Sequence, residues 1–321
     1  MKRVESMISV VVPVFNEEES LNDFYKELIK YLPKLSENYE IIFIDDGSTD
    51  TSFAILKRLE KKDKHIRIFS LRRNIGKAEA LSLGFYKARG DIIVTLDADL
   101  QDQPSEIQKL LNIHQTKGID VVCGWRKNRK DKSKMKIISK LFNIVVRKLF
   151  DVNIHDYNCG LKLYTKEAAK SLRLYGGMHR FIPVLVYEMG FSVDEVPVRH
   201  EMRKFGKSKY GFSKIFKDMP DMFTMLFLVR YMNRPLHFFG IAGGVLAFIG
   251  VAILTYLSVL RFMGERIGTR PLLFLGILLV LVGIQIFFTG FLAELMINVA
   301  HRERMNYPIK YQTGDVDSKI K

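Results

Sequence analysis

Two long apolar stretches near the carboxyl end of the chain restrict the fold more than any other feature. Leu236–Leu260 carries no charged residue, and only Gln285 and Glu294 interrupt the apolar character of Leu272–Ile297. A helix of about 20 apolar residues is long enough to cross the hydrocarbon core of a bilayer. The two stretches therefore predict a transmembrane hairpin, with the polar loop 261–270 between its helices and the lipid bilayer as its partner.

Small residues recur inside both predicted spans. Gly240 and Gly244 form a Gly-x-x-x-Gly pair, and Gly276, Gly283 and Gly290 repeat at a spacing of seven residues. Small residues allow membrane helices to approach each other closely. We therefore expect helix contacts along these glycine-rich faces, either within the hairpin or between copies in a homo-oligomer.

The segment before the hairpin has a different pattern. From Phe212 to Leu226, apolar residues recur every three or four positions, with lysines and aspartates on the other face. This predicts an amphipathic helix at the membrane interface, bent at Pro220, although a core-facing helix has the same periodicity. The chain then has four predicted parts, which are a large domain (1–211), interfacial helices (212–234), the hairpin (235–300) and a tail (301–321).

Two spans place both ends of the chain on one side of the membrane. The start of the chain is polar and lacks the apolar core of a signal peptide, so we expect the large domain and the tail to face the cytoplasm. The expected location is the plasma (inner) membrane, as a multi-pass protein. The positive-inside rule supports this orientation only mildly, because the connecting loop also holds Arg261, Arg266 and Arg270.

The large domain alternates between strand and helix patterns. Apolar, mostly β-branched runs occur at Ile8–Val12, Glu40–Ile44, Ile66–Leu71 and Asp91–Leu96, with helical patterns between them. Nearly continuous apolar strands separated by helices are typical of an α/β fold whose mostly parallel sheet is covered on both faces. In such sheets, ligands bind outside the carboxyl ends of the strands.

Polar residues follow three of these strands, and the third set is the most informative. Side chains alternate along an extended chain, so Asp97 and Asp99, separated by Ala98, should point to the same side. Two carboxylates at a strand end suit Mg²⁺ or Mn²⁺, especially an ion that also holds a diphosphate. The triplet alone also fits a turn with two solvated acids, so the decision depends on the other motifs.

Charge and motif checks exclude several classes of protein. The formal charge is +15, but the basic residues are scattered and form no nucleic-acid-binding motif, so we expect no nucleic-acid partner. A basic surface suits an anionic membrane face and phosphorylated substrates. Cys123 and Cys159 lie too far apart for a zinc site or a disulfide framework. No dinucleotide-binding glycine motif follows a strand, and Glu201 stands where a P-loop ending in Gly206-Lys207-Ser208 requires glycine.

The remaining polar motifs occur in a characteristic order. They are Val12-Pro13-Val14-Phe15-Asn16-Glu17, Ile44-Asp45-Asp46-Gly47-Ser48-Thr49-Asp50, Asn74-Ile75-Gly76-Lys77-Ala78, Asp97-Ala98-Asp99-Leu100-Gln101-Asp102, Gly124-Trp125-Arg126 and Arg203-Lys204-Phe205-Gly206-Lys207-Ser208-Lys209-Tyr210. This set resembles the family 2 glycosyltransferases, and most closely the branch that transfers a sugar from a nucleotide to a polyprenyl phosphate. That branch includes the dolichol-phosphate mannose synthases and the bacterial bactoprenol glucosyltransferases. The resemblance implies a Rossmann-like, nucleotide-sugar-binding domain of GT-A type.

The resemblance also implies roles for individual residues. The implied catalytic residues are Asp97, Asp99, Arg126, Arg203 and Lys209, the nucleotide-sugar-binding residues are Pro13, Phe15, Glu17, Asp46, Lys77, Ala98, Gln101 and Arg180, and the ligands of Mg²⁺ or Mn²⁺ are Asp97, Asp99 and Gln101. The implied reaction is an inverting, metal-dependent hexosyl transfer from a nucleotide sugar to undecaprenyl or another polyprenyl phosphate, for cell-envelope glycosylation. The second pKa of a phosphate monoester is about 6, so this acceptor is largely ionised at neutral pH and needs no strong base.

Other functions stay open beside this one. The resemblance favours UDP-glucose as donor, with GDP-mannose as the alternative. A processive polysaccharide synthase is disfavoured, because Trp125 is the only tryptophan and belongs to no Gln-x-x-Arg-Trp motif. A non-catalytic, nucleotide-sugar-binding membrane scaffold is disfavoured by the intact metal motif.

One segment departs from part of the family. Some bacterial members have Gly-Asp-Phe-Arg-Leu where this chain has Cys159-Gly160-Leu161-Lys162-Leu163, so Gly160 stands in place of an aspartate that is often assigned a catalytic role. Asp156 lies nearby but is offset. It is either a base or a structural residue that caps a turn.

Overall fold

A computed structural model describes residues 3–127, 143–144, 146–147, 150, 152–202, 227, 235–268 and 270–302. The chain divides into two compact units, residues 1–225 and 226–321. The predicted boundary at residue 211, almost all of the predicted interfacial helices over 212–234, and Arg203 and Lys209 lie outside the described residues. They stay predictions.

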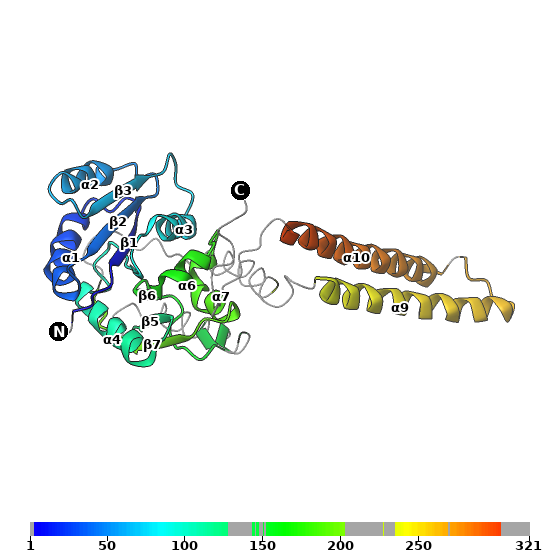
Figure 1. The fold of residues 1–321 in the computed structure, drawn as a ribbon. Coiled ribbons are helices and arrows are strands. Elements are labelled where there is room, and N and C mark those ends of the chain that lie inside the picture. The colour runs from blue at the N-terminus through cyan, green and yellow to red at the C-terminus, as the bar shows by residue number, and fades with distance from the viewer. Residues whose placement is uncertain are drawn as a thin grey trace, which may run out of the picture. The chain divides into compact units, whose positions relative to one another are not determined.

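A seven-stranded sheet forms the centre of the first unit (Figure 1). Its strands are β1 (Ile8–Val14), β2 (Tyr39–Asp45), β3 (Ile66–Ser70), β4 (Ile92–Thr95), β5 (Val121–Trp125), β6 (Lys162–Thr165) and β7 (Val193–Pro197), in the order β3-β2-β1-β4-β6-β5-β7. β6 runs antiparallel to β4 and β5, and the other neighbouring strands are parallel. The predicted α/β fold with a mostly parallel sheet is confirmed.

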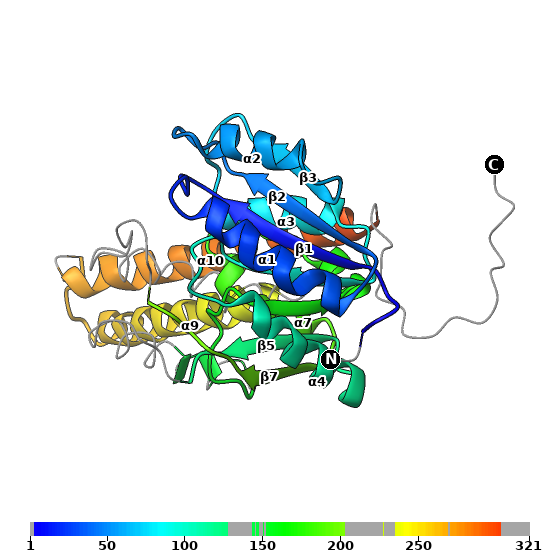
Figure 2. The same cartoon turned by 90° about the vertical axis from the view of Figure 1, so that its left-hand side faces the viewer.

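Helices cover both faces of the sheet, as Figure 2 shows for α1 and α4 on the near side. The helical elements of the first unit are α1 (Leu21–Leu35), α2 (Ser52–Glu60), α3 (Lys77–Lys87), η1 (Pro104–Glu106), α4 (Ile107–Lys117), α6 (Lys166–Ser171), η2 (Met178–Arg180) and α7 (Ile182–Glu188). Alternate residues of β1, such as Val10 and Val12, join the apolar residues of α1, α2 and α4 in one core. α3 packs on the opposite face of β1 and β2 and contacts α6 and η2. Burial on both faces explains the continuous apolar strands.

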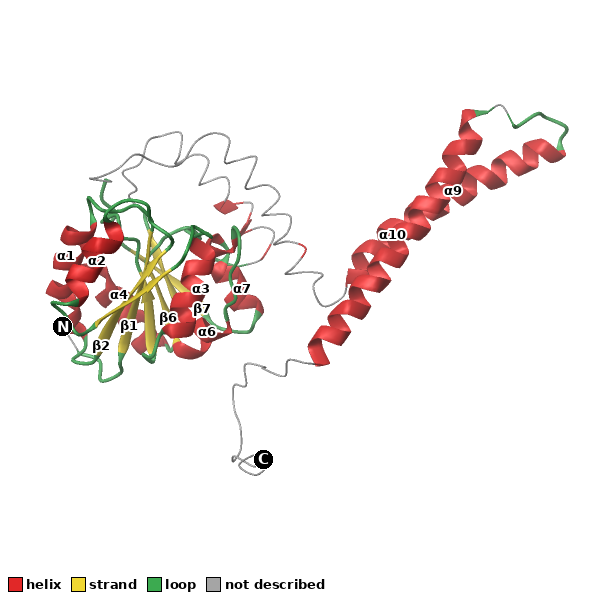
Figure 3. Cartoon of the chain, turned by 90° about the horizontal axis from the view of Figure 1, so that it is seen from above, coloured by secondary structure: helices red, strands yellow, loops and turns green. Residues whose placement is uncertain are grey.

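The sheet register brings segments distant in sequence to one edge. Val14 pairs with Asp45 and Val11 with Thr95, so the residues that follow β1, β2 and β4 meet at the same edge, seen from above in Figure 3. The antiparallel β6 reverses this rule, because Lys162 at its amino end pairs with Thr95 at the carboxyl end of β4. The segment before β6 therefore lies beside the Asp97 loop.

Two helices make up the described part of the second unit. α9 (Pro235–Phe262) and α10 (Pro271–Arg302) match the two predicted spans, and Pro235–Phe262 and Pro271–Met296 are long and apolar enough to cross a membrane. Their large apolar side chains are mostly exposed, as expected for surfaces that face lipid. The Glu294 carboxylate accepts a hydrogen bond from the backbone N–H of Leu236 at 3.2 Å, so it caps the amino end of α9.

Glycines hold α9 and α10 close together. A Cβ on Gly283 would lie 2.6 Å from both the Ala247 nitrogen and the Gly243 oxygen, and one on Gly290 would lie 2.6 Å from Phe239 Cβ. Gly276, the third residue of the predicted repeat, likewise faces α9. By contrast, a Cβ on Gly244 would meet nothing within 4 Å. The seven-residue repeat therefore forms the contact between α10 and α9 within the hairpin. An oligomer through the glycine-rich faces stays a prediction.

Candidate active site

Hydrogen bonds join the loops after β1 and β2. The Asn16 backbone N–H donates to Ser48 Oγ at 3.0 Å, and the Asn16 side-chain oxygen accepts from the Thr49 backbone N–H at 2.8 Å. Asn16 has a φ of 55°, which a non-glycine residue adopts only when its surroundings hold it there. The predicted nucleoside-binding residues of this loop, Pro13, Phe15 and Glu17, are half-buried at the carboxyl end of β1.

Asp46 organises the loop that precedes α3. Its buried carboxylate accepts hydrogen bonds from Asn74 Nδ2 at 2.9 Å and from the backbone N–H groups of Ile75 and Gly76 at 2.8 and 3.0 Å. Burial raises the pKa of Asp46, and the two backbone hydrogen bonds offset this only in part. Asp46 therefore fixes the position of the first residue of α3, which is Lys77, and its predicted contact with the nucleotide stays a prediction.

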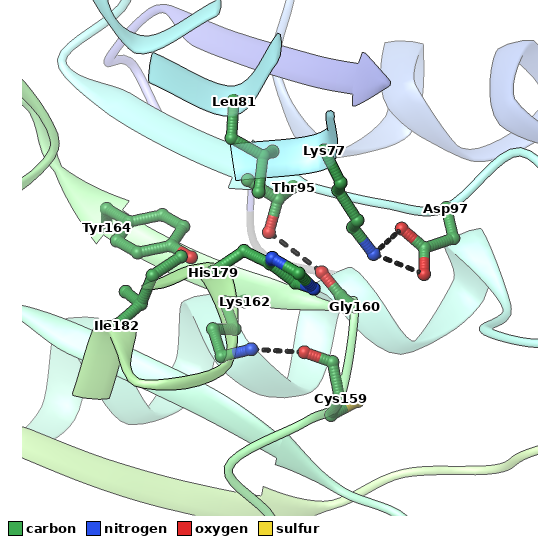
Figure 4. Close-up of a pocket in the computed structure, with 10 residues that line it drawn as sticks. All are labelled: Lys77, Leu81, Thr95, Asp97, Cys159, Gly160, Lys162, Tyr164, His179 and Ile182. Atoms are coloured by element: carbon green, nitrogen blue, oxygen red, sulfur yellow. Dashed lines mark hydrogen bonds and ion pairs between the residues drawn. The ribbon is translucent and has the colours of Figure 1, made fainter. Parts of the chain in front are cut away.

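Lys77 and Asp97 form an ion pair across the site. Lys77 Nζ lies 2.6 and 2.7 Å from the two carboxylate oxygens of Asp97, and both side chains are about one-third exposed (Figure 4). Burial alone would raise the pKa of Asp97, but the charge and hydrogen bonds of Lys77 outweigh it, so this pKa lies below its usual value. Asp97 is therefore a carboxylate at neutral pH.

The loop after β4 presents the rest of the predicted metal motif. Asp99 and Gln101 are half-buried, and the Gln101 backbone N–H donates to Asp99 Oδ1 at 3.1 Å. Leu100 between them has a φ of 60° and a buried side chain, and Ala98 is also buried. A strained backbone of this kind costs about 1–3 kcal/mol and is often found at functional sites. This turn follows the carboxyl end of β4, so Asp99 and Gln101 lie beyond the end of that strand.

The donor set fits a divalent cation that shares its ligands with a substrate. Two carboxylates and a nearby amide oxygen are hard ligands of the type that Mg²⁺ and Mn²⁺ take, and Mg²⁺ commonly completes its shell with phosphates and water. Within the described part of the chain, no group of three or more His, Cys, Asp or Glu side chains forms a cage for a metal. The motif therefore suits a cation that arrives with a diphosphate.

Arg126 and Asp156 form a largely buried ion pair. Arg126 Nε and Nη2 donate to the two carboxylate oxygens of Asp156 at 2.7 and 2.9 Å, and the side chains are 11 % and 4 % exposed. Burial would lower the pKa of Arg126, but the Asp156 carboxylate outweighs it and raises that pKa. Asp156 also accepts a hydrogen bond from the Asn158 backbone N–H at 3.2 Å. Of the two roles considered for Asp156, this geometry favours the structural one.

Gly160 packs closely against the Asp97 carboxylate. Its carbonyl accepts a hydrogen bond from Thr95 Oγ1 at 2.8 Å. A Cβ at this position would lie 2.7 Å from Asp97 Oδ2 and 3.1 Å from Asp102 Oδ2. A side chain at position 160 would therefore collide with the Asp97 carboxylate, so the site leaves room only for glycine there.

Sequence reasoning missed two residues of this site. Lys162 is buried at the amino end of β6, and His179 lies on η2, next to the predicted nucleotide-binding residue Arg180, which is also buried. Both line a small cavity with Lys77 and Asp97. The available signal was a lysine within the apolar run Leu161–Tyr164, while nothing in the sequence singles out His179.

Several known proteins are similar to this chain over most of its length. The family model described as "Glycosyl transferase family 2" matches residues 9–173. A dodecaprenyl-phosphate galacturonate synthase of Rhizobium johnstonii is 38% identical over 92% of this chain and 89% of its own length. An undecaprenyl-phosphate 4-deoxy-4-formamido-L-arabinose transferase of Photorhabdus laumondii is 34% identical over 96% of this chain and 94% of its own length.

A solved structure shares the fold of the first unit. The glucosyl-3-phosphoglycerate synthase of Mycobacterium tuberculosis matches with a TM-score of 0.54 at 18% identity, covering 70% of this chain and 80% of that one. The same enzyme has been solved with Mn²⁺ and UDP-glucose, and that complex matches with a TM-score of 0.52 at 18% identity, over 70% of this chain and 79% of that one. The matched family model and the two full-length relatives show that the chain belongs to glycosyl transferase family 2.

Proposed function

We propose that this glycosyltransferase moves one sugar from a nucleotide sugar to a polyprenyl phosphate at a membrane. The proposal rests on one observation: among the described residues, the structure has no free carboxylate at the position where a general base is expected. That position is Gly160, closed to a side chain by Asp97, and the nearby Asp156 is bound on both oxygens by Arg126. An acceptor hydroxyl would need a base, whereas a phosphate monoester is already ionised at neutral pH.

The charges of the site match this reaction. Negative charge builds on the leaving diphosphate as the anomeric carbon departs, and groups placed to meet that charge stabilise the transition state. A divalent cation, when bound by Asp97 and Asp99, supplies Lewis-acid stabilisation of the leaving group. Lys77 adds a positive charge beside Asp97. Attack by the acceptor phosphate on the far face of the sugar would give inversion in a single displacement.

The membrane helices and the relatives support the acceptor. A soluble donor and a lipid phosphate meet only at a membrane surface, and α9 and α10 would hold the enzyme there. Both full-length relatives are named for a polyprenyl phosphate. We propose undecaprenyl phosphate or a similar lipid as acceptor, with the domain on the cytoplasmic side, where nucleotide sugars are made.

The relatives and the structure limit the identity of the donor sugar less than that of the acceptor. UDP-glucose is the donor expected from the resemblance, but the relatives reported above are named for galacturonate and for 4-deoxy-4-formamido-L-arabinose. The donor therefore has to be identified by a panel that includes UDP-glucose, uronic-acid donors and GDP-mannose.

The test measures sugar transfer to undecaprenyl phosphate by the full chain in nanodiscs, with each donor of the panel. We expect a lipid-linked sugar from at least one donor, loss of product in EDTA, and recovery with Mn²⁺ or Mg²⁺. Asp99→Asn should lower transfer by about 100-fold or more, because it removes a charged metal ligand, while the variant still inserts into membranes.

Asp23→Asn, a change in an exposed ion pair on α1, is the matched control and should keep full activity. If no donor gives a lipid product although UDP or GDP still binds, the chain is a nucleotide-binding scaffold. If Asp99→Asn retains transfer, the metal motif has been assigned wrongly.

A further inference from the structure

Lys162 is a buried cation without an anionic partner among the described residues. Its side chain is at the amino end of β6, and the residue is 3 % exposed. Its Nζ donates a hydrogen bond to the Cys159 carbonyl, a neutral acceptor, and within the described part of the chain it forms no ion pair. A buried charge costs several kcal/mol unless an opposite charge and hydrogen bonds compensate it. Such a position suits an anion brought by a ligand.

The cavity beside Lys162 is small and polar on one side. Figure 4 shows Lys77 and Asp97 at one end of it and Tyr164 and Ile182 at the other. Its volume is about 10 Å³, which is room for about one water molecule. The cavity therefore has room for one oxygen atom of a ligand, whereas a sugar ring or a diphosphate does not fit in it.

The carboxylate that lines this cavity already has a partner. Both oxygens of Asp97 are held by Lys77 at 2.6 and 2.7 Å, so Asp97 does not neutralise Lys162 by direct contact. The charge of Lys162 nevertheless reaches Asp97 and contributes to the lowering of its pKa. The cavity thus carries excess positive charge directly behind the aspartate loop that is expected to hold the donor diphosphate.

His179 adds a second unsatisfied group. Its Nδ1 is buried and has no hydrogen-bond partner among the described residues. Burial, followed by the charges of Lys77 and Arg180, lowers the pKa of His179 to about 3, so the ring is neutral at physiological pH. A neutral imidazole can donate to or accept from a sugar group without adding to the charge of the cavity.

We propose that Lys162 binds the carboxylate of an acidic sugar and thereby selects a nucleotide uronate as donor. This inference rests on the proposed function. A carboxylate oxygen fits the room beside Lys162, and an ion pair there would compensate the buried ammonium. The diphosphate of the donor carries the same kind of oxygen, but its expected place is at the Asp97–Asp99 loop, outside this cavity.

The experiment compares two pairs of donors that differ only at C6, where one member has a carboxylate and the other a hydroxymethyl group. The pairs are UDP-galacturonate with UDP-galactose and UDP-glucuronate with UDP-glucose, and transfer to undecaprenyl phosphate is measured as kcat/KM. Hydrogen bonds to charged groups contribute enough for about a 10- to 100-fold effect. We expect wild type to prefer one uronate over its neutral partner by that factor.

Lys162→Met should remove this preference by lowering kcat/KM for the uronate about 10- to 100-fold, with little change for the neutral donor. Lys166→Met is the matched control, because Lys166 is half-exposed at the start of α6 and should leave the ratio unchanged. Affinity for UDP alone, measured by calorimetry, should stay the same in Lys162→Met. Should that variant fail to fold, the wild-type donor ratio still tests the proposal.

Results that contradict this inference differ from results that contradict the proposed function. Equal use of both members of each pair by wild type overturns the inference but leaves lipid-sugar synthesis intact. An equal loss for both members in Lys162→Met, with weaker UDP binding, assigns Lys162 to the diphosphate instead. Absence of any lipid product from every donor overturns the proposed function itself.

Discussion

The partner of Asp156 distinguishes between the two roles that the sequence allows for this residue. By sequence it was either a base or a structural residue, and the structure places it in a two-point ion pair with Arg126, buried on both sides. A carboxylate held in this way orients the arginine, whose predicted role is to meet a diphosphate or an acceptor phosphate. The phosphate-binding role predicted for Arg126 would therefore depend on Asp156 for the orientation of the guanidinium.

We expect Asp156→Asn to lower the free energy of unfolding by about 3 kcal/mol, because it leaves a buried guanidinium without its counter-charge. Urea unfolding of the full chain in detergent measures this change. Asp194→Asn, which breaks an exposed ion pair with Lys117, should cost less than about 1 kcal/mol. If Asp156→Asn unfolded normally but lost the acidic limb of the pH–rate profile, Asp156 would be the base after all.

Glu40 makes stability depend on pH. Burial alone would raise the pKa of Glu40, but hydrogen bonds from Ser9, Arg67 and the Arg89 backbone outweigh it, so this pKa lies below its usual value. A lowered pKa stabilises the folded state above the unfolded pKa, and that stability is lost as the pH falls through the folded value. Glu40→Gln should therefore be less stable than wild type at pH 7.

The difference between Glu40→Gln and wild type should shrink as the pH falls below about 4.5, the usual range of a glutamate pKa. Urea midpoints measured at several pH values between neutrality and acid would show this convergence. A difference that stayed constant over the whole range would mean that Glu40 contributes through packing rather than through its charge.

At the scale of elements, the position of β6 decides the shape of the site. An antiparallel strand inserted between β4 and β5 presents its amino end at the edge where the parallel strands present their carboxyl ends. Gly160 and Lys162 therefore lie beside Asp97, although more than sixty positions separate them in the sequence. Strand alternation alone cannot predict this, because it does not fix strand order.

The hairpin helices depend on glycine at their contact. Gly283→Leu should separate α9 from α10, because even a Cβ would lie 2.6 Å from the Gly243 oxygen. Overpacking of this kind costs about 1–3 kcal/mol, so the thermal midpoint in nanodiscs should fall by several degrees. Gly244→Leu, where a Cβ meets nothing within 4 Å, is the control and should leave the midpoint unchanged. Equal effects of the two changes would argue against the observed helix packing.

At the scale of the whole molecule, a family 2 catalytic fold and two apolar helices share one chain. Two spans require both termini on one side of the membrane and the loop after α9 on the other. A reporter fused after Lys321 should therefore report the cytoplasm, and one inserted at the exposed Gly268 should report the opposite side. Alkaline phosphatase and fluorescent-protein fusions distinguish the two sides. Reporters at both sites on the same side would mean that the helices lie on the membrane without crossing it.

The sequence predicts the α/β domain, the two apolar helices and the loop after β4, because periodicity, length and local chemistry are properties of neighbouring residues. Tertiary structure alone decided which side chains meet. Lys77 reaches Asp97, Arg126 holds Asp156, and Lys162 faces the cavity because of strand order and the reversed β6. The sequence likewise does not say which helix the seven-residue glycine repeat contacts, and the packing of α9 against α10 decides it. Contacts between distant segments depend on topology, which local patterns do not encode.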